Sequence, residues 1–135
     1  MVGFEIRGVR VEDYLDIIKI NSEIKEETIR LVKEDSNHFM IVGQLNDEVI
    51  GYLKGSIDTK NKTIFIESFS VDEKYKGLGV GYQLLLEIEK ELNKRYIKKI
   101  IHLNNVYDED EVRFFNRQGF ILGENLNYEK IVILQ

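Results

Sequence analysis

The sequence predicts an α+β domain in which helices cover a central, largely antiparallel twisted sheet. Three strand-like segments follow one another through short connections near the middle of the chain, and short connections favour antiparallel neighbours. Two helical patterns precede these segments, and two more alternate with the strands that follow. The expected order is therefore β-α-α-β-β-β-α-β-α-β-β, a mixed α/β arrangement.

Seven segments alternate apolar and polar residues, or carry β-branched and aromatic residues, as strands do. The connections at residues 45–48 and 58–62 contain Asn and Asp, which favour turns, and are short enough for hairpins. The expected strands are residues 4–9, 38–44, 49–57, 63–71, 98–103, 120–123 and 128–134.

Four segments show helical spacing of apolar residues. They begin at residue 11, at residue 21, after the glycines near residue 80, and at residue 108. Asn21 or Ser22 is the expected N-cap of the second helix, and Leu15 and Leu31 are expected on the buried faces of the first two. The fourth helix begins with acidic residues, which helix N-termini favour, and ends at Gly119.

Composition indicates a single domain, residues 1–135, that is large enough for a hydrophobic core. Hydrophobic residues make up 43% and charged residues 32%, as in soluble globular proteins. Without cysteine, disulfides and thiolate catalysis are excluded and no metal site is expected. The net charge of −5 argues against nucleic acid as a partner. No apolar run approaches the roughly 20 residues of a membrane span, and we expect a cytoplasmic protein.

The most informative segment is the glycine loop, residues 72–81. Gly77, Gly79 and Gly81 stand between a strand-like run and an amphipathic helix, beside Lys74 and Lys76. Glycine permits positive φ and lets the backbone approach a ligand closely. The start of the following helix offers unpaired N–H groups and a partial positive charge. The loop is therefore expected to hold a phosphate or pyrophosphate.

The spacing of the loop argues against the common nucleotide-binding motifs. A P-loop needs lysine and a hydroxyl residue after its glycine, whereas here lysine precedes the glycine and no hydroxyl follows. A Rossmann fingerprint needs its third glycine three residues after the second, and here the interval is two. The companion motifs of a kinase loop are missing from the sequence.

Three segments resemble parts of the GNAT N-acetyltransferase superfamily. Residues 71–81, VDEKYKGLGVG, resemble its acyl-CoA loop, Arg/Gln-x-x-Gly-x-Gly/Ala, between the fourth strand and third helix. Residues 114–120, FFNRQGF, resemble its segment aliphatic-Tyr-Glu-Lys-x-Gly-Phe, and residues 6–13 resemble its first strand and helix. The resemblance implies a GNAT fold over nearly the whole chain and acetyl-CoA as co-substrate.

The resemblance also implies which residues contact coenzyme A. Backbone N–H groups of the glycine loop would hold the pyrophosphate, and the pantetheine arm would pair with the end of the fourth strand. Lys74 or Lys76 would meet a phosphate, although a solvated turn explains these lysines equally well. The residues expected to bind the cofactor are Phe69, Ser70, Val71, Lys74, Lys76, Gly77, Leu78, Gly79, Val80, Gly81, Tyr82, Asn104 and Phe115.

Glu67 is the expected catalytic base or amine-orienting group. It lies four residues before Val71, a placement similar to that of a glutamate in several GNAT amine acetyltransferases. Strict alternation along the strand would put Glu67 on one face with Phe65 and Phe69, opposite Ser68. A strand glutamate that faces solvent or binds a cationic substrate is the alternative.

The general acid is harder to identify. The family's usual tyrosine aligns with Phe115, which cannot donate a proton. Tyr107 and Tyr82 are nearby candidates for this role, and water is the alternative proton source for the thiolate. His102 lies on an apolar strand and is expected to be a core or interface histidine.

The predicted function is transfer of acetyl from acetyl-CoA to a primary amine by direct attack, without a covalent enzyme intermediate. Two alternatives stay open: an acyl-CoA-binding regulatory domain with weak or no catalysis, and an interaction module that kept only the scaffold. The acceptor, a small molecule or a peptide or protein, is not specified by the sequence. Residues 11–35 are expected to form one wall of its site, and a homodimer is compatible with the sequence.

Overall fold

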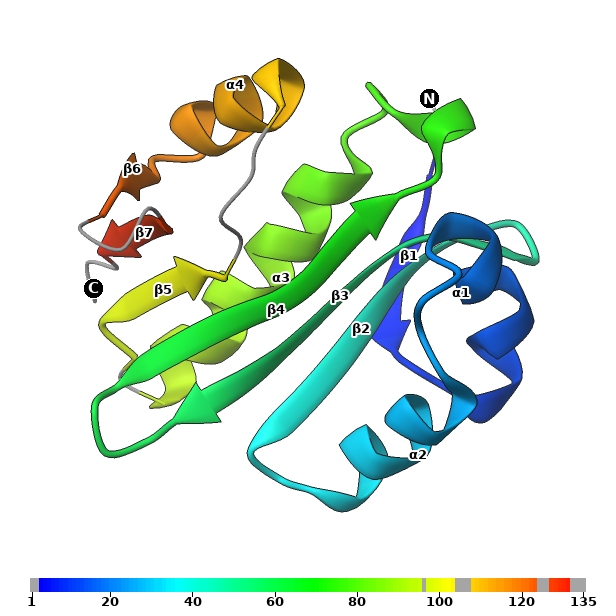
Figure 1. The fold of residues 1–135 in the computed structure, drawn as a ribbon, viewed down its shortest axis with the longest axis horizontal. Helices are drawn as coiled ribbons and strands as arrows, with labels where there is room; N and C mark the ends of the chain where they lie inside the picture. Colours follow the sequence, from blue (N-terminus) through cyan, green and yellow to red (C-terminus); the bar gives the residue numbers. More distant parts are fainter. Residues whose placement is uncertain (1–2, 96, 104–107, 124–126, 132–135) are drawn as a thin grey trace.

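The computed structural model describes residues 3–95, 97–103, 108–123 and 127–131. Its strands form one sheet in the order β1-β2-β3-β4-β5-β7-β6 (Figure 1). Neighbouring strands are antiparallel except β4 and β5, which are parallel. The α+β class and the predicted order of elements are therefore confirmed.

The helices and strands agree with the expected segments to within a few residues. The strands are β1 (Glu5–Gly8), β2 (His38–Leu45), β3 (Glu48–Asp58), β4 (Thr63–Val71), β5 (Lys99–His102), β6 (Ile121–Leu122) and β7 (Tyr128–Ile131). The helices are α1 (Tyr14–Ile20), α2 (Glu26–Glu34), α3 (Val80–Arg95) and α4 (Glu109–Arg117), with 3-10 turns at Val11–Asp13 and Glu73–Tyr75.

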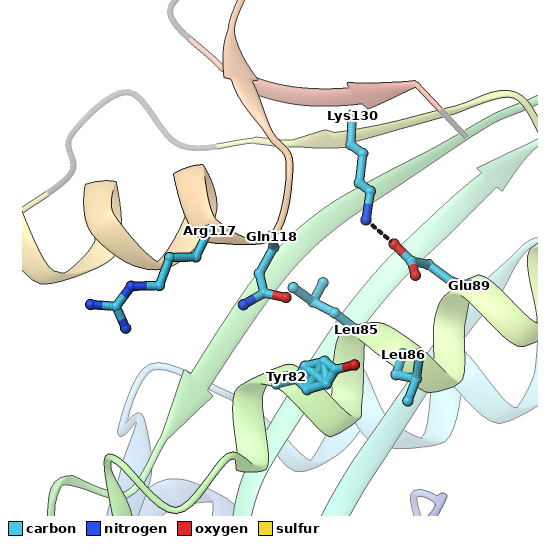
Figure 2. Close-up of a pocket in the computed structure, with 7 residues that line it drawn as sticks. All are labelled: Tyr82, Leu85, Leu86, Glu89, Arg117, Gln118 and Lys130. Carbon is cyan, nitrogen blue, oxygen red and sulfur yellow. Dashed lines mark hydrogen bonds and ion pairs between the residues drawn. The ribbon is translucent and has the colours of Figure 1, made fainter. Parts of the chain in front are cut away.

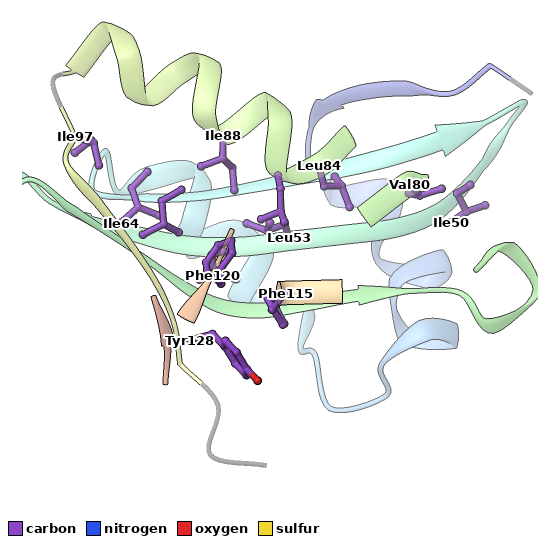
Figure 3. Packing of buried hydrophobic residues seen from close by; sticks show 13 residues of the cluster. Ile50, Leu53, Ile64, Val80, Leu84, Ile88, Ile97, Phe115, Phe120 and Tyr128 are labelled. Carbon is purple, nitrogen blue, oxygen red and sulfur yellow. The ribbon is translucent and has the colours of Figure 1, made fainter. Parts of the chain in front are cut away.

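Helices cover both faces of the sheet and divide the core into two layers. On one face α1 and α2 pack against β3 and β2, and α3 crosses the opposite face (Figure 1). Figure 3 shows the larger layer, in which α3, α4 and the sheet bury a common set of side chains. That layer consists of Ile50, Leu53, Ile64, Ile66, Val80, Leu84, Leu85, Ile88, Ile97, Ile100, Phe115, Phe120 and Tyr128.

The first two helices differ from expectation in their starts and in their buried faces. Lys25, not Asn21 or Ser22, precedes α2 as its N-cap. Asn21 instead accepts from the Glu23 backbone N–H and so ends α1 in a turn. Leu15 and Leu31 are exposed, so they lie on the outer faces of α1 and α2. The buried residues on these helices are Ile17, Ile29 and Val32.

An ion pair fixes the entry into α1. Arg7 on β1 donates two hydrogen bonds of 2.8 Å to the two carboxylate oxygens of Asp13. Burial raises the pKa of Asp13, but hydrogen bonds from the Arg7 side chain and the Arg10 backbone outweigh it, so the pKa lies below its usual value. The pair therefore anchors the helical segment to the first strand as long as Asp13 is ionised.

Candidate functional site

The glycine loop joins the end of β4 to the start of α3. The Asp72 side chain accepts from the Lys74 backbone N–H at 3.0 Å and shapes the first turn. Gly77 and Gly79 have φ of 87° and 88°, a region that other residues enter only with strain. A Cβ at either position would meet no atom within 4 Å, so both glycines border open space. The loop therefore presents bare backbone to its surroundings.

Two further glycines let the start of α3 press against the sheet. Val80, the first residue of α3, is buried, and its Cγ1 atom lies 3.0 Å and 3.1 Å from where a Cβ would stand on Gly43 and Gly51. Larger residues on β2 and β3 would push the helix outward. The first-turn N–H groups of α3, which have no partner within a helix, are thereby fixed beside the loop.

Both predicted phosphate lysines have neighbours in the loop itself. Lys76 Nζ lies 2.8 Å from a carboxylate oxygen of Glu73. This hydrogen bond is the main cause of the raised pKa of Lys76, and the charges of Asp108 and Asp110 at the start of α4 add to it against the effect of burial. Lys74 Nζ lies 5.8 Å from the centre of the Tyr75 ring. Lys76 would exchange Glu73 for a phosphate if it met one.

The sheet opens beside the second half of β4. Pairing with β5 runs from Thr63 opposite Lys99 to Ile66 opposite His102. Beyond this point the described part of the chain provides β4 with a partner strand only on the side of β3. Figure 1 shows β4 continuing toward the glycine loop after β5 has ended. Main-chain groups on this edge at residues 67–71 can therefore pair with an extended ligand.

A β-bulge in β4 changes the predicted placement of Glu67. Ile66 lies opposite Gly55 and Ser68 lies opposite Lys54, so Glu67 is the extra residue between them. Strict alternation is therefore wrong at this point, and Glu67 does not share a face with Phe69. Glu67 is exposed and accepts a hydrogen bond of 2.9 Å from Lys54 Nζ. The sequence gives no signal for this partner, because it comes from the neighbouring strand.

Aromatic side chains fill the opposite face beside the opening. Phe69 contacts the rings of Phe114, Phe115 and His102, with centroid distances from 5.8 to 6.5 Å. Phe115 is 2% exposed and stacks on Tyr128 at 5.5 Å, so it is a core residue. Phe114, which the sequence did not single out, lies closer to the loop, 3.3 Å from the Cβ position of Gly81.

His102 is buried within this aromatic group, as predicted for a core histidine. Its ring centre lies 4.6 Å from that of Phe115. Burial lowers the pKa of His102 to about 4, because the charged imidazolium loses its hydration there. The imidazole is therefore neutral at physiological pH.

The other residues predicted to bind the cofactor or to donate a proton lie on β4, in the glycine loop, on α3 or outside the described residues. Ser70 and Val71 lie on the open half of β4, opposite Tyr52 and Gly51 of β3. Leu78 and Tyr82 are each 43% exposed. Tyr107 and Asn104 lie outside the described residues.

A polar pocket of about 190 Å³ lies one helical turn beyond the loop, between α3, the end of α4 and β7 (Figure 2). Glu89 and Lys130 form an ion pair at one side of it. Among its lining residues the sequence predicted a contact with the cofactor only for Tyr82, because the pocket joins distant segments. These residues are Tyr82, Leu85, Leu86, Glu89, Arg117, Gln118 and Lys130.

Among the described residues, no group of three or more His, Cys, Asp or Glu side chains could hold a metal ion. Within the same ranges, none of the helices combines the length and apolar character that crossing a bilayer requires.

Comparison with known proteins identifies the family. The acetyltransferase (GNAT) family model matches residues 9–120, which include the glycine loop and the Gly119-Phe120 segment. The chain belongs to the GNAT family. Solved structures with this fold include Ard1 from Thermoplasma volcanium, with a TM-score of 0.83 at 19% identity over 98% of this chain and 99% of that one.

Other relatives of this GNAT chain carry more detailed names. The Thermoplasma acidophilum PaiA N-acetyltransferase, solved with coenzyme A, has a TM-score of 0.78 at 17% identity over 96% of this chain and 99% of that one. The N-alpha-acetyltransferase of Sulfurisphaera tokodaii is 27% identical, over 98% of this chain and 84% of that protein. The spermine/spermidine N(1)-acetyltransferase of Bacillus subtilis is 30% identical over 82 aligned residues, which are 56% of this chain. The alignment spans about half, 52%, of that protein.

Proposed function

We propose that this GNAT protein transfers the acetyl group of acetyl-CoA to a primary amine by direct attack. The observation that supports this most is the meeting of three features at one end of β4. The strand edge opens after Ile66, the glycine loop leads from the end of β4 into α3, and the exposed carboxylate of Glu67 stands at the bulge where the opening begins. The amine acceptors named for the relatives from Bacillus subtilis and Sulfurisphaera tokodaii support the same reaction class.

The residues present fit coenzyme A. The open space beside Gly77 and Gly79 admits a pyrophosphate to the backbone N–H groups at the start of α3. The edge of β4 at residues 69–71, which no described strand covers on the side of β5, would accept the amide-bearing pantetheine arm as a strand accepts a neighbour. Tyr82 and Arg117, which line the pocket of Figure 2, would receive the adenosine end and its phosphate.

Glu67 is the proposed base or orienting group for the acceptor. Amines titrate near 8 to about 10.4, so most of the acceptor is protonated at neutral pH and must lose a proton before it reacts. The exposed carboxylate of Glu67 can bind the ammonium and take its proton, directly or through water. Acetyl-CoA supplies a thioester whose C–S bond breaks as the new N–C bond forms. Phe115 has no proton to give the leaving thiolate, so water or Tyr107 is the proposed donor.

Glu67→Gln tests this assignment. We expect turnover, measured as free thiol released with a panel of amines and peptides, to fall by about 100-fold or more. The calorimetric affinity for coenzyme A should change by less than about twofold, because Glu67 lies outside the glycine loop. Glu129→Gln is the matched control, since Glu129 on β7 also pairs with a lysine of the adjacent strand, 3.1 Å from Lys99. Equal losses of turnover and coenzyme affinity in Glu67→Gln would make Glu67 structural.

A regulatory acyl-CoA-binding domain is the second candidate, favoured by Phe115 at the position of the family's tyrosine. Calorimetric binding of coenzyme A without thiol release from any amine would support it. Absence of binding at millimolar coenzyme would refute both candidates. The single-domain organisation, the cytoplasmic location and the homodimer expected from the sequence remain predictions.

A further inference from the structure

The carboxylate proposed to receive the acceptor already holds an ammonium group. Lys54 Nζ lies 2.9 Å from Oε1 of Glu67. The Lys54 side chain is only 16% exposed, and that of Glu67 is 32% exposed. An incoming amine would therefore meet a carboxylate whose charge is balanced by a lysine of the same chain.

Lys54 is held in place by the middle of the sheet. It lies on β3 directly opposite Ser68, next to the bulge. Two residues earlier, the buried Tyr52 shares a hydrogen bond of 2.6 Å with the Ser68 hydroxyl and accepts another from Asn21. These bonds tie β3, β4 and the end of α1 together. The lysine can release Glu67 but its charge stays within a side chain's length of the site.

On the same face of the sheet, the described carboxylates of β4 and β7 are not available to bind a second ammonium group of an acceptor without displacing a lysine. Residues opposite one another share a face, which places Phe65, Ile101, Glu129 and Ile121 in one row. Glu129 is itself paired with Lys99 at 3.1 Å. Ile121 and Ile131 on the outer strands are 68% and 65% exposed. From β4 toward β6 this face thus bears apolar side chains, whereas Ser56 of β3 lies opposite Phe65 and Ser68 lies beside the bulge. Its described carboxylates on β4 and β7 are both paired.

We propose that Lys54 determines acceptor specificity: it makes the site select against polyamines and favour an acceptor with one amine and apolar neighbours. This inference rests on the proposed function of Glu67. A single amine can displace Lys54 from Glu67 and leave one unit charge nearby. A polyamine brings a second ammonium a few bonds away, which is repelled by the displaced Lys54. A peptide or protein N-terminus with apolar side chains meets the requirement, because it can also cover the exposed isoleucines.

The test compares binding of two acceptors to the coenzyme A-saturated protein by calorimetry. The acceptors are spermidine and the peptide Ala-Val-Leu-Gly amide, which carries one amine. In Lys54→Met, we expect both acceptors to bind more tightly, because neither has to displace Lys54 from Glu67. The gain for spermidine should be about tenfold larger than the gain for the peptide, because only spermidine brings a second ammonium. Lys54→Gln, which keeps a polar group, should give the same selective gain.

Lys99→Met is the matched control. Lys99 also pairs with a glutamate on this face, but it lies opposite Thr63, about 13 Å along β4 from Glu67. That separation exceeds the screening length at physiological salt, so spermidine affinity should stay within about twofold.

The outcomes separate this inference from the proposed function. Equal gains for both acceptors, no gain for spermidine in either Lys54 variant, or a gain as large in Lys99→Met would overturn the role of Lys54. Thiol release from acetyl-CoA is measured in parallel. A selective gain in binding without thiol release from any amine would refute acetyl transfer and leave the assignment of Lys54 standing.

Discussion

Lowering the pH from 7 to 4 is expected to destabilise the fold by about 3 kcal/mol through His102 alone. Burial lowers the pKa of this histidine from 6.5 to about 4, and one pKa unit corresponds to about 1.4 kcal/mol. Between these two pH values the unfolded chain binds a proton that the folded chain excludes. Stability from this source is therefore complete above pH 6.5, falls as the pH drops, and is lost near pH 4. Urea unfolding at half-unit steps of pH measures it.

His102→Leu supplies the comparison, because leucine cannot take up a proton. The variant loses ring contacts with Phe69 and Phe115, and this loss does not depend on pH. From pH 7 to pH 4 the unfolding free energy of the unchanged protein must fall by about 3 kcal/mol relative to that of the variant, since other titrating groups are common to both proteins. Parallel stability curves would show that His102 titrates normally in the folded state, and the burial argument would then fail.

Three more changes probe the loop, the helix anchor and the bulge. Gly79→Glu should abolish calorimetric binding of coenzyme A through steric block and charge repulsion. Gly79→Ala, which is strained by about 1 kcal/mol at this positive φ, should still unfold in one cooperative thermal transition. Asp13→Asn should lower the urea unfolding free energy by about 3 kcal/mol, because it leaves the charge of Arg7 without its partner; retained stability would contradict this. Tyr52→Phe should cost about 1 to 2 kcal/mol in the same assay, since it removes the bonds to Ser68 and Asn21, and a cost equal to zero would show that the bonds do not contribute.

The features that could be predicted from the sequence are those set by neighbouring residues. The hairpin from β2 to β3 turns at Asn46, whose positive φ of 55° suits asparagine. Gly77 and Gly79 predicted a backbone conformation that the loop adopts, and the acidic residues at 108–111 form a capping box at the start of α4. In each case the physical cause lies within four residues along the chain, so the pattern is visible in the sequence.

The faces of α1 and α2 could not be predicted in the same way. Their buried residues depend on where each helix begins, and that point is set by contacts between distant segments. Arg7 on β1 holds Asp13 before α1, and Asn21 after it bonds to Tyr52 on β3. Residues two apart on an α-helix point about 200° away from each other around its axis, so when these contacts turn Ile17 into the core, Leu15 faces solvent.

The bulge at Glu67 shows why the chemistry of the site is less predictable than its fold. One extra residue in β4 turns Glu67 away from Phe69 and toward Lys54, thirteen residues earlier in the chain. A period-two pattern cannot reveal this, because a bulge is a property of two strands paired with each other. The aromatic face and the charged face of β4 thereby separate: Phe69 borders the opening beside β5, and Glu67 meets solvent on the other face. Such a division would bring the coenzyme and the acceptor amine to β4 from different faces of the sheet. It also makes Lys54 the group that competes with that amine for the carboxylate of Glu67.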